Sequence, residues 1–299
     1  MTYIGRFAPS PTGLLHFGSL LAATASYLQA RSQHGQWLLR IEDLDKPREQ
    51  TGAADAIIQT LAAYGFEWDQ SIIFQSQRLA AYTDALNSLK PFIYACCCSR
   101  KQLQTFAHRG SFGLIYPGTC RYKSYALTDS LTMRIKTNEQ TICFNDQIQG
   151  LFCQNLEREL GDFVIRRADQ IFAYQLAVVV DDAWQGITEI VRGSDLLDNT
   201  PRQIYLQQLL GYLIPSYAHI PIAINVLGQK LSKQTLAPAL TTQTHELLDN
   251  LVKALQFLGQ TSTEAPSFST LKECWDWAID NWDLSKIPKQ LAYHPMHFA

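Results

Sequence analysis

The chain has 299 residues, of which 46% are hydrophobic and 17% are charged. This apolar content is enough for a folded core and excludes a protein that is disordered throughout. The 25 Lys and Arg residues against 27 Asp and Glu residues give a net charge of −2, which excludes a polybasic protein but not a local basic groove for nucleic acid.

Strand and helix patterns alternate over the first 65 residues. We predict strands over residues 3–8 and 37–41, and helices over residues 19–31 and 53–64, where apolar residues recur at helical spacing. A strand–helix–strand–helix order is typical of a parallel sheet. The chain therefore begins as an α/β fold.

The second half returns to this pattern after a stretch of different character. The near-continuous apolar run over residues 172–180 predicts a strand buried on both faces. Another strand is expected over 187–191 and a helix over 201–213. Helices over 246–258 and 271–282 predict a helical C-terminal region, and residues 292–299 give no clear pattern.

These patterns divide the chain into four parts. Residues 1–75 and 166–240 are expected to be the two halves of one α/β domain. Residues 76–165 hold a cysteine cluster and only weak strand alternation, which indicates an inserted subdomain. Residues 241–299 form the helical region.

Composition also bears on the compartment. No apolar run approaches the ~18 residues of a membrane span, and the N-terminus lacks a charged segment followed by an apolar one, so we expect a cytoplasmic protein. Seven cysteines, four of them within residues 96–120, favour a metal site or free thiols over a disulfide framework. We interpret Cys143, Cys153 and Cys274 as small core hydrophobes.

The first segment whose residue types suggest a binding or catalytic site lies between a predicted strand and a predicted helix. Residues 6–13 read RFAPSPTG, and residues 16–19 read HFGS. Unpaired N–H groups at a helix N-terminus suit an anion such as a nucleotide phosphate, which His16 could also contact. A glycine such as Gly18 lets a ligand approach the backbone, and Arg6 offers a fork for a carboxylate. An ordinary capped turn is the alternative.

Two later segments carry further cations. Residues 230–234 read KLSKQ, and such a dilysine loop could clamp a leaving pyrophosphate; a solvated Lys/Ser loop is the alternative. Residues 190–195 read IVRGSD, where Arg192 at a strand end could point into a crevice or lie in a surface turn.

Taken together and in this order, these segments resemble the signatures of class I glutamyl-tRNA synthetases. Residues 40–45, which read RIEDLD, resemble the next strand end of that family, and KLSKQ is a variant of its Lys-Met-Ser-Lys-Ser loop. The resemblance covers about residues 3–240. It implies a Rossmann-type parallel sheet with an inserted zinc-binding subdomain.

Only about 60 residues follow the lysine segment, so no anticodon-binding domain is expected. In this respect the chain resembles a paralogous group of the family, the glutamyl-Q tRNA(Asp) synthetases, as does the stretch KLSKQTLAPA over residues 230–239. The resemblance implies ATP-dependent activation of L-glutamate to glutamyl-adenylate and transfer to the queuosine base of tRNA(Asp). It implies ATP as substrate, Mg²⁺ with the ATP, and no membrane partner; we expect a monomer.

The resemblance also implies roles for individual residues. His16, Lys230 and Lys233 would be catalytic, with Gly18 joining His16 and Lys233 in holding ATP. The glutamate-binding residues would be Arg6, Ala8, Ser10, Glu42, Tyr174 and Arg192. Glu42 would pair with the α-ammonium group, and an arginine with the side-chain carboxylate. We therefore expect the His16 turn and the lysine segment to meet at one nucleotide.

The cysteine cluster would hold one structural zinc ion. Cys96 and Cys98 can face one tetrahedral ion, and Cys120 follows a Pro-Gly turn that can fold back to them. The resemblance implies that Tyr116 completes the site. His108 is the alternative fourth ligand, Cys97 could compete for a position, and free thiols are the alternative to a metal site.

Three other functions compete with this expectation. A short glutamyl-tRNA synthetase would charge a tRNA 3′ end, and a glutamate ligase would use a non-RNA acceptor. A non-catalytic RNA-binding paralogue is disfavoured because it would not need His16, Gly18 and Lys233.

Overall fold

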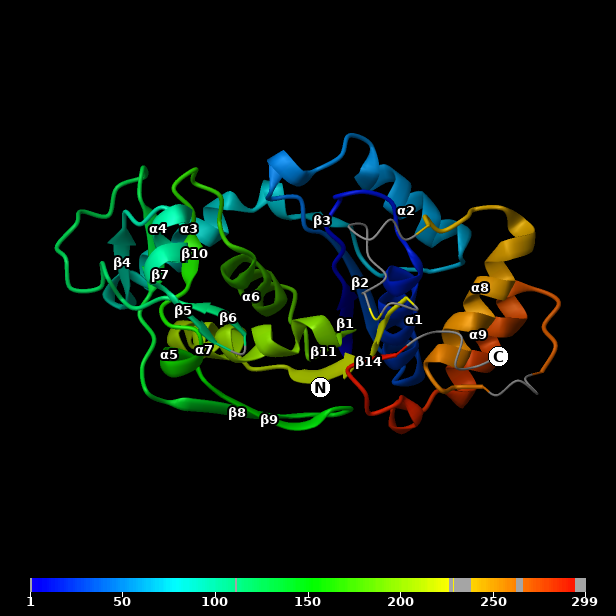
Figure 1. Cartoon of the computed structure of the whole chain (residues 1–299). Coiled ribbons are helices and arrows are strands. Elements are labelled where there is room, and N and C mark those ends of the chain that lie inside the picture. The colour runs from blue at the N-terminus through cyan, green and yellow to red at the C-terminus, as the bar shows by residue number, and fades with distance from the viewer. Residues whose placement is uncertain (1, 111, 226–227, 229–237, 262–265, 294–299) are drawn as a thin grey trace.

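A computed structural model gives the fold of residues 2–110, 112–225, 228, 238–261 and 266–293. Its helices and strands fall into two groups at opposite ends of the molecule, joined by a central parallel sheet (Figure 1). None of the helices in these ranges combines the length and apolar character that a membrane crossing requires.

The central sheet is parallel, as the alternation of elements predicts. Strand β1 (Ile4–Phe7) pairs with β2 (Gln36–Ile41), which pairs with β3 (Ile73–Phe74). On the other side of β1, β11 (Glu189–Gly193) pairs with β12 (Ser216–Ile220). Hydrogen bonds between Ile4 and Thr188 join the two halves. Segments more than 180 residues apart thus lie side by side, and their carboxyl ends share one edge.

Most of the expected elements of the two halves and of the helical C-terminal region are confirmed. The expected strands over 3–8, 37–41 and 187–191 correspond to β1, β2 and β11. The expected helices correspond to α1 (Phe17–Ser32), α2 (Ala53–Ala63), α7 (Thr200–Leu210), α8 (Thr244–Phe257) and α9 (Leu271–Asn281). Two short strands, β13 (Ile222–Ala223) and β14 (Ala292–Tyr293), pair in parallel beside the sheet.

One prediction is wrong: residues 172–180 do not form a strand. They enter helix α6 (Tyr174–Trp184), whose residues 175–182 are all buried. An apolar run that is enclosed on every side shows no amphipathic period, so a buried helix and a buried strand look alike in sequence. The three valines at 178–180 favour a strand by propensity, and packing against α3 (Leu79–Ser88) and α7 overrides that preference.

The inserted part of the chain is mainly antiparallel. Strands β4 (Ile93–Cys96) and β10 (Val164–Arg166) flank β7 (Thr132–Ile135), and β8 (Thr141–Asp146) forms a hairpin with β9 (Gly150–Asn155). The smaller elements of this part are α3 (Leu79–Ser88), α4 (Arg100–Phe106), β5 (His108–Gly110), β6 (Gly113–Ile115) and α5 (Leu156–Glu159). The described 3₁₀ turns of the chain are Lys46–Arg48, Gln75–Gln77, Lys90–Phe92, Ser194–Asn199 and Leu284–Lys286.

The interpretation of two cysteines as core residues is also wrong. Cys143 and Cys153 are exposed, lie opposite each other in the β8–β9 hairpin and form a disulfide. Their spacing of ten residues carries no sign of a tight hairpin in the sequence, so the pairing could not be anticipated. Cys274 is fully buried in α9, as expected.

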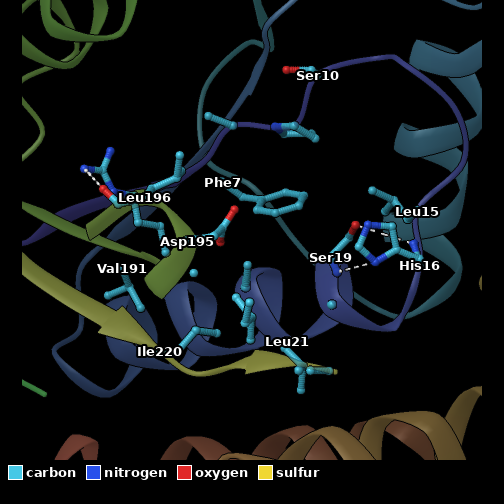
Figure 2. A pocket seen from close by; sticks show the side chains of 18 of the residues that line it. Phe7, Ser10, Leu15, His16, Ser19, Leu21, Val191, Asp195, Leu196 and Ile220 are labelled. Atoms are coloured by element: carbon cyan, nitrogen blue, oxygen red, sulfur yellow. Dashed lines mark hydrogen bonds between the residues drawn. The ribbon is translucent and has the colours of Figure 1, made fainter. Parts of the chain in front are cut away.

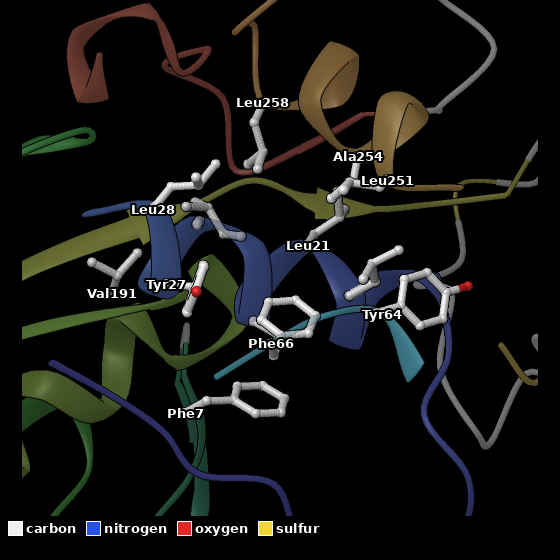
Figure 3. Packing of buried hydrophobic residues seen from close by; sticks show 14 of the residues in the cluster. Phe7, Leu21, Tyr27, Leu28, Tyr64, Phe66, Val191, Leu251, Ala254 and Leu258 are labelled. Atoms are coloured by element: carbon white, nitrogen blue, oxygen red, sulfur yellow. The ribbon is translucent and has the colours of Figure 1, made fainter. Parts of the chain in front are cut away.

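Helix α1 is the structural centre of the chain. Phe7, Tyr27 and Phe66 lie on its sheet side, while Leu251 and Leu258 lie on its other side (Figure 3). The ring of Tyr27 packs edge-on against Trp37, Phe66 and Trp275 with centroids 5.0–5.4 Å apart. Aromatic pairs of this kind contribute about 0.5–1.5 kcal/mol each beyond their buried area. This packing fixes the position of the N-terminus of α1, which faces the carboxyl edge of the sheet.

Candidate active site

A cavity of about 490 Å³ opens where β1 and β11 end and α1 begins. Figure 2 shows His16 and Ser19 on one side of it and Leu196 on the other. Seven of the residues singled out in the sequence line this cavity: Arg6, Ala8, Ser10, His16, Gly18, Tyr174 and Arg192. Lys230 and Lys233 lie outside the described residues. The edge of a parallel sheet thus brings together residues from both halves of the chain.

His16 is the N-cap of α1. Its Nδ1 accepts a hydrogen bond from the Ser19 N–H at 3.3 Å, and Ser19 Oγ accepts one from the His16 N–H at 3.4 Å. Because Nδ1 is an acceptor, the proton of the neutral ring is on Nε2. Gly13, just before this turn, has φ of +138°, which residues with a side chain rarely adopt. The turn therefore places an N–H donor and the positive end of a 16-residue helix at the cavity.

The residues that precede and follow the lysine segment both lie next to the cavity or the His16 turn. Ile222 and Ala223 line the cavity. Beyond the segment, Ala239 pairs with His16 in an antiparallel bridge, and the Leu240 N–H donates to the Leu15 carbonyl at 2.8 Å. The chain therefore passes from the cavity wall into the lysine segment and returns beside the His16 turn.

A buried ion-pair network lies next to the cavity and fixes Arg6, one of its lining residues. Arg6 donates to both carboxylate oxygens of Asp182, at 3.2 and 3.4 Å, and Arg40 lies 2.8 Å from the same carboxylate. Burial acts to raise the pKa of Asp182, but the charges of Arg6 and Arg40 bring it below its usual value. Helix α6 thus supplies the anion that orients Arg6 at the cavity wall.

Asp181, the preceding residue of α6, is a second buried carboxylate that pairs with side-chain donors. Asp181 accepts hydrogen bonds from Arg78, Tyr82 and Gln75 at 2.6–2.8 Å and is fully buried. The sequence shows the Asp181-Asp182 pair at the end of an apolar run. Such a pair is a signal for buried ion pairing, but the predicted strand ended at residue 180, so the sequence did not place the pair inside a buried element.

Arg192 is held differently from Arg6. It is 5% exposed, and its guanidinium donates to Thr200 Oγ1 at 2.8 Å, to His219 Nε2 at 3.0 Å and to Tyr174 Oη at 3.4 Å. These partners are neutral, so the positive charge is not compensated by them. A desolvated guanidinium of this kind favours a carboxylate ligand over a neutral amide.

Glu42 does not line this cavity but borders an adjoining cavity of about 640 Å³. The two cavities share Ser10, Thr12 and Tyr174, so they meet at these residues. Glu42 accepts from Arg40 at 3.4 Å, and burial raises the pKa of its carboxyl to about 7. This carboxylate is therefore poised to bind a cation that favours its ionised form.

Three of the clustered cysteines converge on one point. The Sγ atoms of Cys96, Cys98 and Cys120 lie within 4.8 Å of one another. A tetrahedral zinc ion with bonds of about 2.3 Å to sulfur needs sulfur atoms roughly 3.8 Å apart, so the cluster fits such an ion. The Tyr116 hydroxyl lies 3.4 Å from Cys96 Sγ and 3.7 Å from Cys98 Sγ. The same hydroxyl accepts a hydrogen bond from the Cys120 N–H at 3.0 Å, so it lies next to all three cysteines.

The two competing ligands lie less favourably. His108 is exposed in β5 and does not belong to this cluster. Cys97 is exposed, and its Sγ is 3.9 Å from that of Cys120. The residues that could hold a metal ion are therefore Cys96, Cys98 and Cys120, with Tyr116 as the adjacent fourth donor.

The parallel sheet, the His16 turn and the arginine-lined cavity define the catalytic domain of a class I aminoacyl-tRNA synthetase. The family model described as tRNA synthetases class I (E and Q), catalytic domain, matches residues 4–278. The glutamyl-Q tRNA(Asp) synthetase of Dechloromonas aromatica (strain RCB) is 52% identical over 292 residues, which cover 96% of each chain. That of Neisseria meningitidis serogroup C (strain 053442) is 52% identical over 298 residues, covering 98% of this chain and all of the relative.

The chain therefore belongs to the glutamyl-Q tRNA(Asp) synthetase family and is an enzyme of the ligase class. This confirms the family indicated by the sequence motifs. The crystal structure of a glutamate-tRNA synthetase from Elizabethkingia anophelis has the same fold, with a TM-score of 0.80 at 23% identity, and the match covers 98% of this chain and 68% of that one.

Proposed function

We propose that this enzyme activates L-glutamate with ATP and transfers the glutamyl group to the queuosine base of tRNA(Asp). The observation that carries the proposal is the 52% identity, over nearly the whole chain, to synthetases named for that reaction. The cavity supports it, because one space is bordered by a carboxylate-binding arginine and by the N-terminus of a helix suited to phosphate.

The activation step joins glutamate to AMP. An oxygen of the α-carboxylate attacks the α-phosphorus of ATP in line, a new O–P bond forms, and the bond to the bridging oxygen breaks to release pyrophosphate. No side chain needs to act as a nucleophile, so catalysis is positioning and charge stabilisation. His16 and Gly18 bind ATP at the end of α1. Lys230 and Lys233 neutralise the departing pyrophosphate. Mg²⁺, when bound with ATP, would be held mainly by phosphate oxygens and water and would supply positive charge to the triphosphate.

Glutamate lies where the two cavities meet. Its side-chain carboxylate pairs with Arg192 and its α-ammonium group with Glu42. Arg192 lines the first cavity and Glu42 the second, and Tyr174 borders both. Arg6, Ala8 and Ser10 complete the pocket. Cys96, Cys98, Tyr116 and Cys120 would hold a zinc ion, which would stabilise the inserted subdomain.

The acceptor is tested by offering two forms of one RNA. Purified enzyme, ATP and labelled glutamate are incubated with tRNA(Asp) that contains queuosine and with tRNA(Asp) that lacks it. The tRNA is then cut into an anticodon fragment and a 3′ fragment. We expect label only with queuosine and only in the anticodon fragment. Label in the 3′ fragment would indicate a short glutamyl-tRNA synthetase. Exchange activity without label in either RNA would indicate a non-RNA acceptor.

The titration of Glu42 gives a second prediction. Its carboxyl must lose a proton to bind the α-ammonium group, and its pKa is raised to about 7. As the pH falls from 8 to 6, KM for glutamate should therefore rise, approaching tenfold per unit below pH 7, since KM reports the free enzyme when binding equilibrates. Glu42→Gln should raise KM at pH 8 and remove this dependence. A wild-type KM that is constant over this range would contradict the role of Glu42.

A further inference from the structure

Behind Arg192 lies a buried chain of hydrogen bonds that reaches into the inserted subdomain. Arg192 Nε donates to His219 Nε2 at 3.0 Å, and His219 Nδ1 lies 2.6 Å from Asp146 Oδ2. The side chains of His219 and Asp146 are fully buried. His219 is in β12, next to the strand of Arg192, whereas Asp146 ends β8.

The partners of the imidazole define its tautomer. Guanidinium nitrogen is only a donor, so His219 Nε2 must be the acceptor and the ring proton must be on Nδ1, where Asp146 accepts it. Burial lowers the pKa of His219 to about 4, so the ring is neutral at pH 7. The charged groups that act on it are Arg192, Asp146 and Asp195.

Asp146 is itself held in one orientation. Its Oδ1 accepts from the backbone N–H groups of Ile148, Gln149 and His219 at 2.9–3.1 Å, which leaves Oδ2 directed at the ring. Burial acts to raise the pKa of Asp146, but the hydrogen bonds from His219 and the backbone bring it below its usual value. The carboxylate is therefore ionised and fixed.

This arrangement differs in charge from that of the other arginine of the site. Arg6 is oriented by direct contact with the Asp182 carboxylate, which compensates its charge. Arg192 is oriented through Nε by a neutral ring, with the carboxylate one imidazole further away. The guanidinium is thus kept in place while its charge stays available to a ligand.

We propose that His219 and Asp146 are positioning residues that hold Arg192 for the side-chain carboxylate of glutamate and so set the discrimination against neutral amino acids such as glutamine. The inference rests on the proposed function, since it deepens the role of the same pocket. It also implies that the β8–β9 hairpin of the inserted subdomain affects substrate selection, because this hairpin supplies Asp146 to the site around Arg192.

The substitution Asp146→Asn tests the hydrogen-bond chain from Arg192 to Asp146, because the new side chain has almost the same shape as the old one. Asn keeps an oxygen for the backbone N–H groups, but its NH₂ group then faces His219 Nδ1. The ring proton moves to Nε2, where it opposes the Arg192 Nε–H, and that hydrogen bond is lost. We expect KM for glutamate to rise at least about tenfold, with kcat and KM for ATP within about threefold of wild type. The glutamate-to-glutamine ratio of kcat/KM should fall by a similar factor.

Two further measurements separate positioning from general damage. ¹H–¹⁵N correlation spectra of the histidine rings should show the His219 proton on Nδ1 in the wild type and on Nε2 in Asp146→Asn. His219→Gln, whose amide can accept from Arg192, should retain more discrimination than His219→Leu. Asp84→Asn, which changes an exposed carboxylate on α3, is the matched control and should behave as wild type.

The outcomes distinguish this inference from the proposed function. If wild-type enzyme activates glutamate and Asp146→Asn has the same KM and the same discrimination, the positioning role is wrong. If wild-type enzyme activates no glutamate, the proposed function is wrong. A His219 ring proton on Nε2 in the wild type would contradict the hydrogen-bond chain, whatever the activity.

Discussion

Replacing Arg192 by alanine should lower kcat/KM for glutamate in ATP–pyrophosphate exchange by about 10²–10³-fold or more. The substrate carboxylate would lose its buried partner, and breaking such a pair on one side costs about 3–5 kcal/mol. The described partners of Arg192 are neutral, so its removal leaves no unpaired carboxylate among them. The fold should therefore persist, as far-UV circular dichroism can show.

Two variants sharpen this test. Arg192→Lys keeps the charge but not the planar fork, so it should recover only part of the lost activity. Arg158→Ala removes an arginine that lines neither cavity and whose side chain is 72% exposed. This variant should keep kcat/KM within about twofold of wild type. Near-normal exchange in Arg192→Ala would remove this residue from the glutamate site.

Replacing Cys120 by serine should abolish zinc binding and destabilise the inserted subdomain. Zinc held by thiolates contributes about 10–16 kcal/mol to the folding of small zinc domains, so losing one of three thiolates has a large effect. Metal analysis of wild-type enzyme purified without chelator should find one zinc per chain, and less than a tenth of that in Cys120→Ser. Thermal unfolding should begin at a lower temperature.

The neighbouring cysteine offers a matched control. Cys97→Ser removes an exposed thiol next to the cluster and should keep stoichiometric zinc. Tyr116→Phe deletes only the fourth donor and should weaken zinc binding in a competition with a chelator. Full zinc content in Cys120→Ser, or none in the wild type, would contradict the site.

The sequence was most informative where residues of distinctive type cluster. The family resemblance implied that Arg6, His16 and Arg192 belong to one site, and all three line one cavity at the edge of the parallel sheet, although their roles stay a prediction. The C-x-C pair and Cys120 predicted a cluster that the structure assembles. The limits of the four domains stay a prediction, as do the roles of Lys230 and Lys233.

The parts that the sequence could not predict depend on tertiary packing. The Asp181-Asp182 pair acts from a helix, which the apolar run concealed. His219 and Asp146 lie 73 residues apart in unremarkable strand patterns, and only the fold brings them to Arg192. Glu42 borders the adjoining cavity, where it accepts a hydrogen bond from Arg40. Apart from the contact between Arg40 and Glu42, which are two residues apart, these contacts join distant parts of the chain and have no local sequence pattern.

Glutamate-dependent ATP–pyrophosphate exchange in the absence of any tRNA tests the central claim most directly. The proposed glutamate and ATP sites lie in two adjoining cavities formed by this chain alone, so activation of glutamate should not need RNA. We predict exchange with glutamate that is not increased by added tRNA, and at least about 10²-fold less exchange with glutamine. Exchange that requires tRNA, or that is equal with glutamine, would contradict the account.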